Sequence, residues 1–146
     1  MERNHVLLEQ IATILSAAGQ EAYARAMQRR SETPVGDIVG AVRTMVVHYE
    51  VAGTRLLRAL VQEERDPQFH VIVDAGRVAH RQWVERVFAP FLVTQEERKR
   101  ERLLAQLVAI TDVYTWKLLR RDSGLSREQT ELALQEMIEA LYERKE

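Results

Sequence analysis

One stretch near the C-terminal end of the chain constrains the fold more than any other. Between Leu103 and Leu119 most residues are apolar, and at helical spacing they face every side of the helix axis. A helix that is apolar on every side must be buried on every side. A domain of 146 residues needs two surfaces to cover such a helix. We expect one to be the chain's own core and the other to be a second copy of the chain.

The remainder of the sequence is also helical in pattern. No run of alternating apolar and polar residues is bounded by turn signals, so we predict an all-α chain without a sheet. Residues 1–146 contain no repeat and no Pro/Gly-rich linker, which indicates a single domain. The apolar stripes predict six helices, at residues 3–30, 34–49, 54–64, 67–88, 95–122 and 126–143.

The boundaries of these helices follow from start and stop signals. A polar cap before a first-turn proline, or a capping box, marks a helix start, and glycine marks an end or a break. The signals are Thr33-Pro34, Gly53-Thr54, Asp66-Pro67, the boxes Thr94–Glu97 and Ser126–Gln129, and Gly124.

The last helix supports the expected second copy of the chain. It carries an apolar stripe beside the long apolar helix, and two antiparallel helices of this kind form a four-helix bundle with their symmetry mates. We therefore predict a homodimer whose interface includes Trp116, Leu119, Leu134, Met137 and Ile138. The alternative is a monomeric bundle in which the other four helices cover both faces.

Composition excludes several classes of function. The chain has 21 Lys and Arg against 22 Asp and Glu, a balance that opposes nonspecific binding to nucleic acid by this chain alone. It has no cysteine, which excludes disulfides and thiolate chemistry. No apolar run is long enough for a signal peptide or a membrane span, so we expect the cytoplasm as its location. We find no catalytic constellation, phosphate loop or metal-ligand spacing, and expect neither enzymatic activity nor a cofactor or metal.

Several polar and aromatic residues could line a pocket. His80 and Trp83 share a helix face, and Gly76, one turn earlier, would leave space beside them. Spacing alone favours a simpler interpretation, a hydrogen-bonded histidine packed beside a core tryptophan. Side chains with an apolar body and a polar tip also suit a site for mixed ligands. The candidate ligand-binding residues are Met45, His48, Tyr49, His80, Trp83, Thr111 and Tyr114.

Two sequence segments resemble one known family. The stretch from Asp112 to Ser126, DVYTWKLLRRDSGLS, is similar to the end of the penultimate helix and the following turn in TetR-family regulators. The middle of the chain resembles one group of that family, on the residues His48-Tyr49-Glu50, Gly53, Leu56 to Glu63, Asp66-Pro67, Gly76-Arg77, His80-Arg81, Trp83 and Phe88-Ala89-Pro90. Together the resemblance covers about residues 33 to 142.

The resemblance implies an effector-sensing and dimerisation domain of a transcriptional repressor. In that family a small ligand binds among the middle helices, tilts a connecting helix and releases the parent protein from DNA. By analogy the segment up to Arg30 is that connecting helix, and DNA binding belongs to an N-terminal helix-turn-helix that these 146 residues do not contain. A different hypothesis is a stand-alone helical module that binds another protein, takes no ligand and has no internal cavity.

Overall fold

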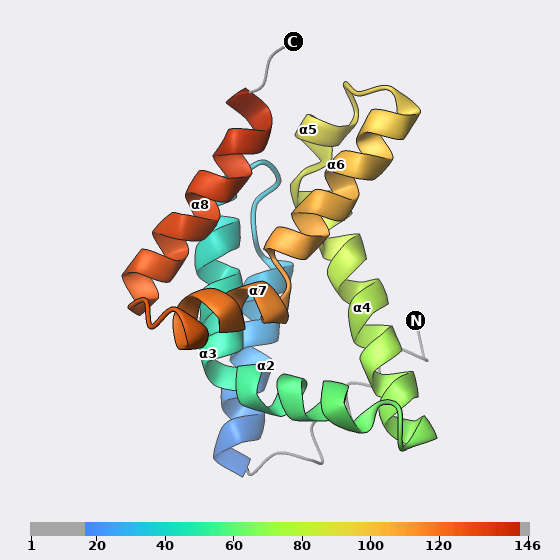
Figure 1. Ribbon diagram of the computed structural model, residues 1–146, viewed down its shortest axis with the longest axis vertical. Helices are drawn as coiled ribbons and strands as arrows, with labels where there is room; N and C mark the ends of the chain where they lie inside the picture. Colours follow the sequence, from blue (N-terminus) through green and yellow to red (C-terminus); the bar gives the residue numbers. More distant parts are fainter. Residues whose placement is uncertain (1–16, 144–146) are drawn as a thin grey trace.

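The computed structural model describes residues 17–143 of the chain. Within this range the chain forms seven α-helices and one π-helical segment, and no strand (Figure 1). In chain order the elements are α2 (Ala17–Ser31), α3 (Ile38–Gln62), α4 (Pro67–Val87), α5 (Ala89–Leu92), α6 (Glu97–Ile110), α7 (Val113–Lys117), η1 (Leu118–Asp122) and α8 (Arg127–Glu143). The prediction of an all-α chain is confirmed for these residues, and positions 3–16 of the expected first helix lie outside them.

Helix α3 lies at the centre of the structure and contacts α2, α4, α7 and α8. Figure 1 shows α8 on one side of α3, with α4 and α6 on the other side. The hydrophobic core combines side chains from these elements, among them Val46, Val84, Leu107, Trp116 and Ile138, all almost fully buried. The core therefore joins segments from the middle and the C-terminal third of the sequence.

Two of the predicted helix starts are confirmed. Asp66 caps α4 by accepting a hydrogen bond from the backbone N–H of Gln68 at 2.9 Å, and Pro67 occupies the first turn. Ser126 precedes α8, and its hydroxyl oxygen accepts from the N–H of Gln129 at 3.1 Å. Gly124, with φ of 69°, reverses the chain before α8 in a conformation that glycine adopts without strain.

Two other predicted starts are wrong. The second helix begins at Ile38 rather than at Pro34, because Asp37 is its cap and accepts from the N–H of Gly40 at 2.9 Å. The capping box expected at Thr94 does not form. Glu96 stands at the N-cap of α6 without a side-chain hydrogen bond, because a turn that follows α5 moves the helix start to Glu97.

The break predicted at Gly53-Thr54 is also wrong, because α3 runs through it without interruption. Figure 1 shows that α3 changes direction in its middle, as helices often do at glycine. The reason for the glycine is packing. A Cβ atom built on Gly53 would lie 2.5 Å from Cζ3 of Trp116, so only glycine lets the indole approach the α3 backbone this closely.

The single long helix expected over residues 95–122 is instead three elements. α6 ends at Ile110, Asp112 caps α7 by accepting from the N–H of Tyr114 at 2.9 Å, and α7 continues into the π-helical segment η1. The apolar stretch is thereby buried by changing direction inside one chain, so that Trp116 packs against α3. The predicted count of six helices is therefore wrong: within residues 17–143 one expected pair is fused in α3, one expected helix is divided into α6, α7 and η1, and α5 is an additional helix.

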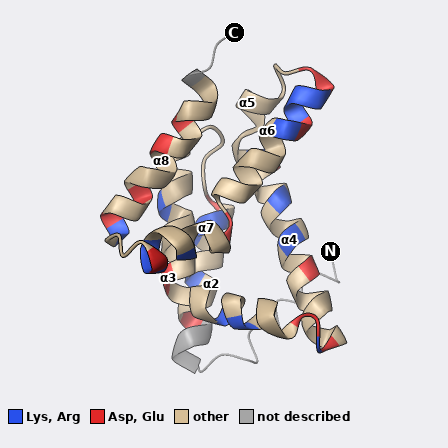
Figure 2. Cartoon of the chain, viewed as in Figure 1, with Lys and Arg blue, Asp and Glu red and all other residues tan. Residues whose placement is uncertain are grey.

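The charged residues cover the outer surface in a mixed pattern. Figure 2 shows both signs side by side at the start of α6, the segment whose run of Arg and Lys is interrupted by Glu. This arrangement is that of a solvated helix surface. Within residues 17–143, no helix combines the length and the apolar character that crossing a membrane requires.

Two glycine substitutions test the packing of α3. We predict that Gly53→Ala lowers the free energy of unfolding by about 1–3 kcal/mol, because the added methyl group overlaps the rigid Trp116 ring. Gly76→Ala, inside α4, should raise it by roughly 0.5–1 kcal/mol, because its Cβ meets no atom within 4 Å and alanine favours the helix. Urea unfolding followed by circular dichroism measures both values. If the two variants are equally stable, the close approach of Trp116 is not what requires Gly53.

Candidate functional site

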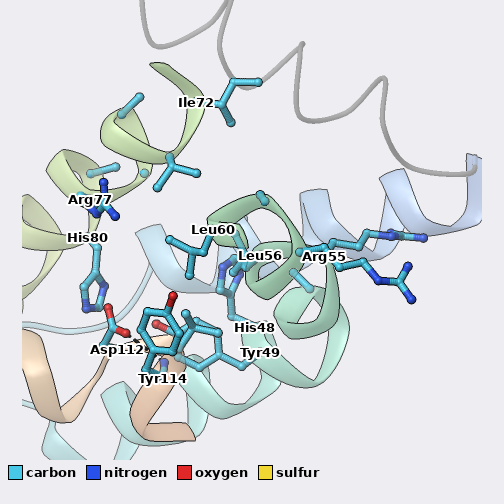
Figure 3. Close-up of a pocket in the computed structure, with 18 of the residues that line it drawn as sticks. His48, Tyr49, Arg55, Leu56, Leu60, Ile72, Arg77, His80, Asp112 and Tyr114 are labelled. Atoms are coloured by element: carbon cyan, nitrogen blue, oxygen red, sulfur yellow. Dashed lines mark hydrogen bonds between the residues drawn. The ribbon is translucent and has the colours of Figure 1, made fainter. Parts of the chain in front are cut away.

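A cavity of about 510 Å³ lies among α2, α3, α4 and the junction between α6 and α7 (Figure 3). Most of its lining is apolar, with side chains such as Leu56, Leu60 and Ile72 on α3 and α4. The polar lining comes from a few residues, which include Arg30, His48, Tyr49, Arg77, His80 and Asp112. A volume of this size and a lining of this kind are typical of small-molecule sites.

Four of the seven predicted ligand-binding residues line the cavity, namely His48, Tyr49, His80 and Tyr114. Figure 3 shows Tyr114 beside Asp112 and Tyr49 at one end of it. Tyr114 is about half exposed, whereas the other three are buried.

The other three predicted residues lie outside the lining. Met45 is buried in the core on α3. Trp83 stacks on the His80 ring with centroids 6.0 Å apart and planes at 18°. Thr111 contacts the far side of the same imidazole. Trp83 and Thr111 therefore hold a cavity residue in place instead of facing the cavity themselves.

A chain of hydrogen bonds fixes the His80 ring. Arg30 donates from Nη2 to Nδ1 of His80 at 3.0 Å, so this nitrogen is an acceptor. The proton of the neutral ring is then on Nε2, which donates to the Thr111 hydroxyl at 3.0 Å. That hydroxyl in turn donates to the carbonyl of Leu107 at 2.7 Å. Three elements, α2, α4 and the end of α6, are joined by this one imidazole.

Further hydrogen bonds attach the C-terminal end of α2 to α4. The indole N–H of Trp83 donates to the Arg30 carbonyl at 2.8 Å. Arg86 donates to the Thr33 carbonyl at 2.9 Å and to the Arg30 carbonyl at 3.3 Å. These bonds replace the partners that the last carbonyl groups of a helix lack. Residues of α4 therefore fix the C-terminal end of α2, whose remaining packing is mainly against α3.

Arg30 is a buried cation in the cavity wall. Its side chain is nearly inaccessible, and its guanidinium carbon lies 5.3 Å from the centroid of the Trp83 ring. Among residues 17–143, no carboxylate forms a salt bridge with it. Burial lowers the pKa of the guanidinium from its usual value, because charging a desolvated group is unfavourable.

Both histidines of the cavity are neutral near pH 7. Burial, together with the charge of Arg30, lowers the pKa of His48 to about 3 and that of His80 to about 4. Burial also raises the pKa of the Tyr49 phenol, whose hydroxyl donates to the Thr111 carbonyl at 2.6 Å. The cavity wall therefore carries neutral hydrogen-bonding groups around one buried positive charge.

Sequence reasoning missed Arg30, Arg77 and Asp112 as residues of the cavity. Arg30 falls in the last turn of α2, where a basic side chain is the usual complement to the helix dipole and gives no sign of burial. Asp112 stands as one polar residue inside an apolar run. A carboxylate at such a position is a signal for a helix cap, and it could have indicated the turn that brings Asp112 to the cavity.

The structure places three of the predicted interface residues in the core of the same chain. Trp116, Leu134 and Ile138 are buried there, and Leu119 is partly buried against it. Their surface is covered by α3 and its neighbours, because the turn at Asp112 directs the apolar residues of α7 inward. Of the five, Met137 is the exposed one, on the outer face of α8.

Comparison with protein-family models, with curated proteins and with solved structures finds no match for this chain. The site is therefore interpreted from its own geometry. Among residues 17–143, no three His, Asp or Glu side chains come together in an arrangement that could hold a metal ion. The groups available at the cavity are suited to binding an organic molecule by apolar contact and hydrogen bonds.

The two buried histidines give a prediction for stability against pH. Their pKa values, about 3 and 4, lie below the unfolded value of about 6.5, so the unfolded chain binds protons first as the pH falls. Stability is thus complete above pH 6.5 and decreases toward pH 4, by up to about 1.4 kcal/mol per pH unit for each histidine. Urea unfolding between pH 7.5 and 5 measures this slope.

A variant assigns that slope to the cavity. His80→Gln should reduce it, because the substitution removes one of the two buried imidazoles. A free energy of unfolding that stays constant from pH 7.5 to 5 would contradict the neutral, buried state of these rings.

Proposed function

We propose that this chain is the ligand-sensing and dimerisation domain of a TetR-like transcriptional repressor, and that a small, largely apolar molecule binds in the cavity. The observation that carries the proposal is the cavity itself, about 510 Å³ with a mostly apolar lining and a few buried polar groups. The resemblance of residues 112–126 to that family adds to it. A helical module that only binds another protein needs no such cavity.

The apolar lining gives a ligand something to bind. Leu56, Leu60 and Ile72 border the open cavity, and an apolar molecule that covers them removes apolar surface from water. Gly76 leaves more room than helix packing requires, because a Cβ at this position would meet nothing within 4 Å. These features favour a binding role for the space.

The ties between the cavity and α2 suggest how binding acts at a distance. Arg30, near the C-terminal end of α2, is hydrogen-bonded to the cavity residue His80. By the family resemblance, α2 belongs to the helix that connects to the DNA-binding domain. We propose that a ligand in the cavity changes this hydrogen bond and shifts α2, which releases the parent protein from DNA. A ligand can do so only by binding more tightly to one position of α2 than to the other.

Filling the cavity tests the proposed sensor. We predict that Gly76→Phe places a ring in the open space of the cavity. The ring occupies volume that the ligand would fill, so ligand binding should weaken at least tenfold. Val78→Phe is the matched control, since Val78 is an exposed residue of α4 outside the cavity lining. The measurement is a thermal-shift screen of a small-molecule library on the 146-residue chain, followed by calorimetric titration of the hits. If no compound binds, or if both variants bind as the parent does, the cavity is not a ligand site.

Because most of the predicted interface residues are buried in the core of the same chain, the proposed homodimer must form through exposed apolar residues. The outer side of α8 exposes Leu132 and Met137, and Leu118 is exposed on η1. We predict that Met137→Glu dissociates the dimer without unfolding the chain, because a buried, unpaired carboxylate is unfavourable at an interface. Val93→Glu, at an exposed position after α5, is the control and should leave the dimer intact. Sedimentation measures both, and a monomeric parent chain would refute the dimer.

A further inference from the structure

We propose that the ligand of this cavity is an organic anion, a carboxylate attached to an apolar body, which pairs with the guanidinium of Arg30. This inference rests on the proposed ligand-sensing function and specifies the chemistry of the ligand. It follows from a buried charge that the described part of the protein does not neutralise.

Arg30 is buried and has few hydrogen-bond partners among the described residues. The residue is 8% exposed, and the hydrogen bond of its guanidinium within residues 17–143 is the one from Nη2 to the neutral His80 ring. A guanidinium has five N–H donors, so most of them are free of protein acceptors in this range. A buried charge is unfavourable unless it is paired, and removal from water makes an incoming opposite charge especially favourable. A carboxylate, which matches the guanidinium fork with two oxygens, is the natural partner.

The charges around the cavity favour an anion. Four arginines line it, Arg30, Arg55, Arg58 and Arg77, against one acidic residue, Asp112. Asp112 is already engaged as the cap of α7. Arg77 is neutralised by its pair with Glu63 at 2.8 Å, and Figure 3 shows Arg55 directed away from the cavity. Buried Arg30 is therefore the charge that a ligand meets, and the exposed charges at the rim disfavour a cation.

The imidazole of His48 carries a buried nitrogen without a partner among the described residues. This residue lines the cavity and is 3% exposed, and its Nδ1 has no hydrogen-bond partner among the described residues. Polar groups that are buried normally have partners, and a bound molecule can supply a missing one. The ring of His48 lies on the same wall as Tyr23, with centroids 5.8 Å apart. A polar head group is therefore expected at this wall.

The remaining lining defines the apolar body of the ligand. Leu56 and Leu60 of α3 and Ile72 of α4 border the cavity, and Figure 3 places Ile72 at the far end from Asp112 and Tyr114. An aromatic or aliphatic body of up to drug-like size fits a cavity of about 510 Å³. The ligand is thus a monoanion with one charged end and an uncharged body, rather than a polyanion such as a nucleotide.

Pairs of compounds that differ only in charge test this proposal. The probes are 2-naphthoate with 2-naphthamide, and decanoate with decanamide, titrated calorimetrically into the 146-residue chain at pH 7.5. We expect each acid to bind about 10- to 100-fold more tightly than its amide, the range for hydrogen bonds to a charged group. Arg30→Gln should reduce this ratio to near one, and Arg30→Lys should retain part of it.

The matched control is Arg43→Gln, which removes the same charge from an exposed position of α3 outside the lining and should preserve the acid preference. If Arg30→Gln does not fold, the acid-to-amide ratio of the parent chain still decides the question. Equal binding of acids and amides overturns the anionic ligand and leaves the proposed sensor in place. Failure of both acids to bind overturns it as well, and the library screen on neutral compounds then shows separately whether the sensor proposal also fails.

Discussion

The change of chain direction between Thr111 and Asp112 is the constraint on which the core and the cavity both depend. Asp112 stops the apolar segment from continuing as one helix, by capping α7 in a new direction. This turn sends Trp116 against the Gly53 backbone of α3, where the indole closes the core. It also leaves the Thr111 hydroxyl and carbonyl facing His80 and Tyr49, which they hold in place. In one straight helix the side chains of residues 111 and 116 would point in directions fixed relative to each other. Such a helix could place Trp116 in the core or Thr111 at the cavity wall, but not both.

The buried polar groups of the cavity form one coupled system. Burial and the positive charge of Arg30 keep His48 and His80 neutral by lowering their pKa, and the neutral His80 ring can then accept from Arg30. Protonation of His80 would place two donors face to face at Nδ1 and break that hydrogen bond. The arrangement is therefore self-consistent only with one positive charge at this wall. A ligand of opposite charge is compatible with this state, whereas a cationic ligand would oppose it.

The sequence predicted the helical class, and it predicted helix ends where the signal is local. Asp66-Pro67 and Ser126 are such signals, because the cap bonds to residues within one turn. The predictions at Gly53 and Thr94 were wrong because they depend on parts of the chain outside the local sequence. Gly53 is required by the indole of Trp116, and the turn after α5 moves the helix start away from Thr94. Aromatic and histidine residues near the cavity could be identified by type, since such side chains carry polar tips on apolar bodies. Arg30 could not be identified as a cavity residue from the sequence, because arginine at a helix end is normally solvated. Its burial becomes visible only from its packing against Trp83.

Helix α2 packs mainly against α3, and a small number of hydrogen bonds attach its C-terminal end to α4. The carbonyl of Arg30 is held by Trp83 and Arg86, and its side chain by His80, all three on α4. A molecule that draws the guanidinium toward the cavity centre acts on the residue whose backbone fixes the end of α2. In the proposed mechanism, the free energy for moving α2 would come from neutralising a buried charge, which no purely apolar ligand can supply. Charge recognition and movement of α2 would thus depend on the same residue.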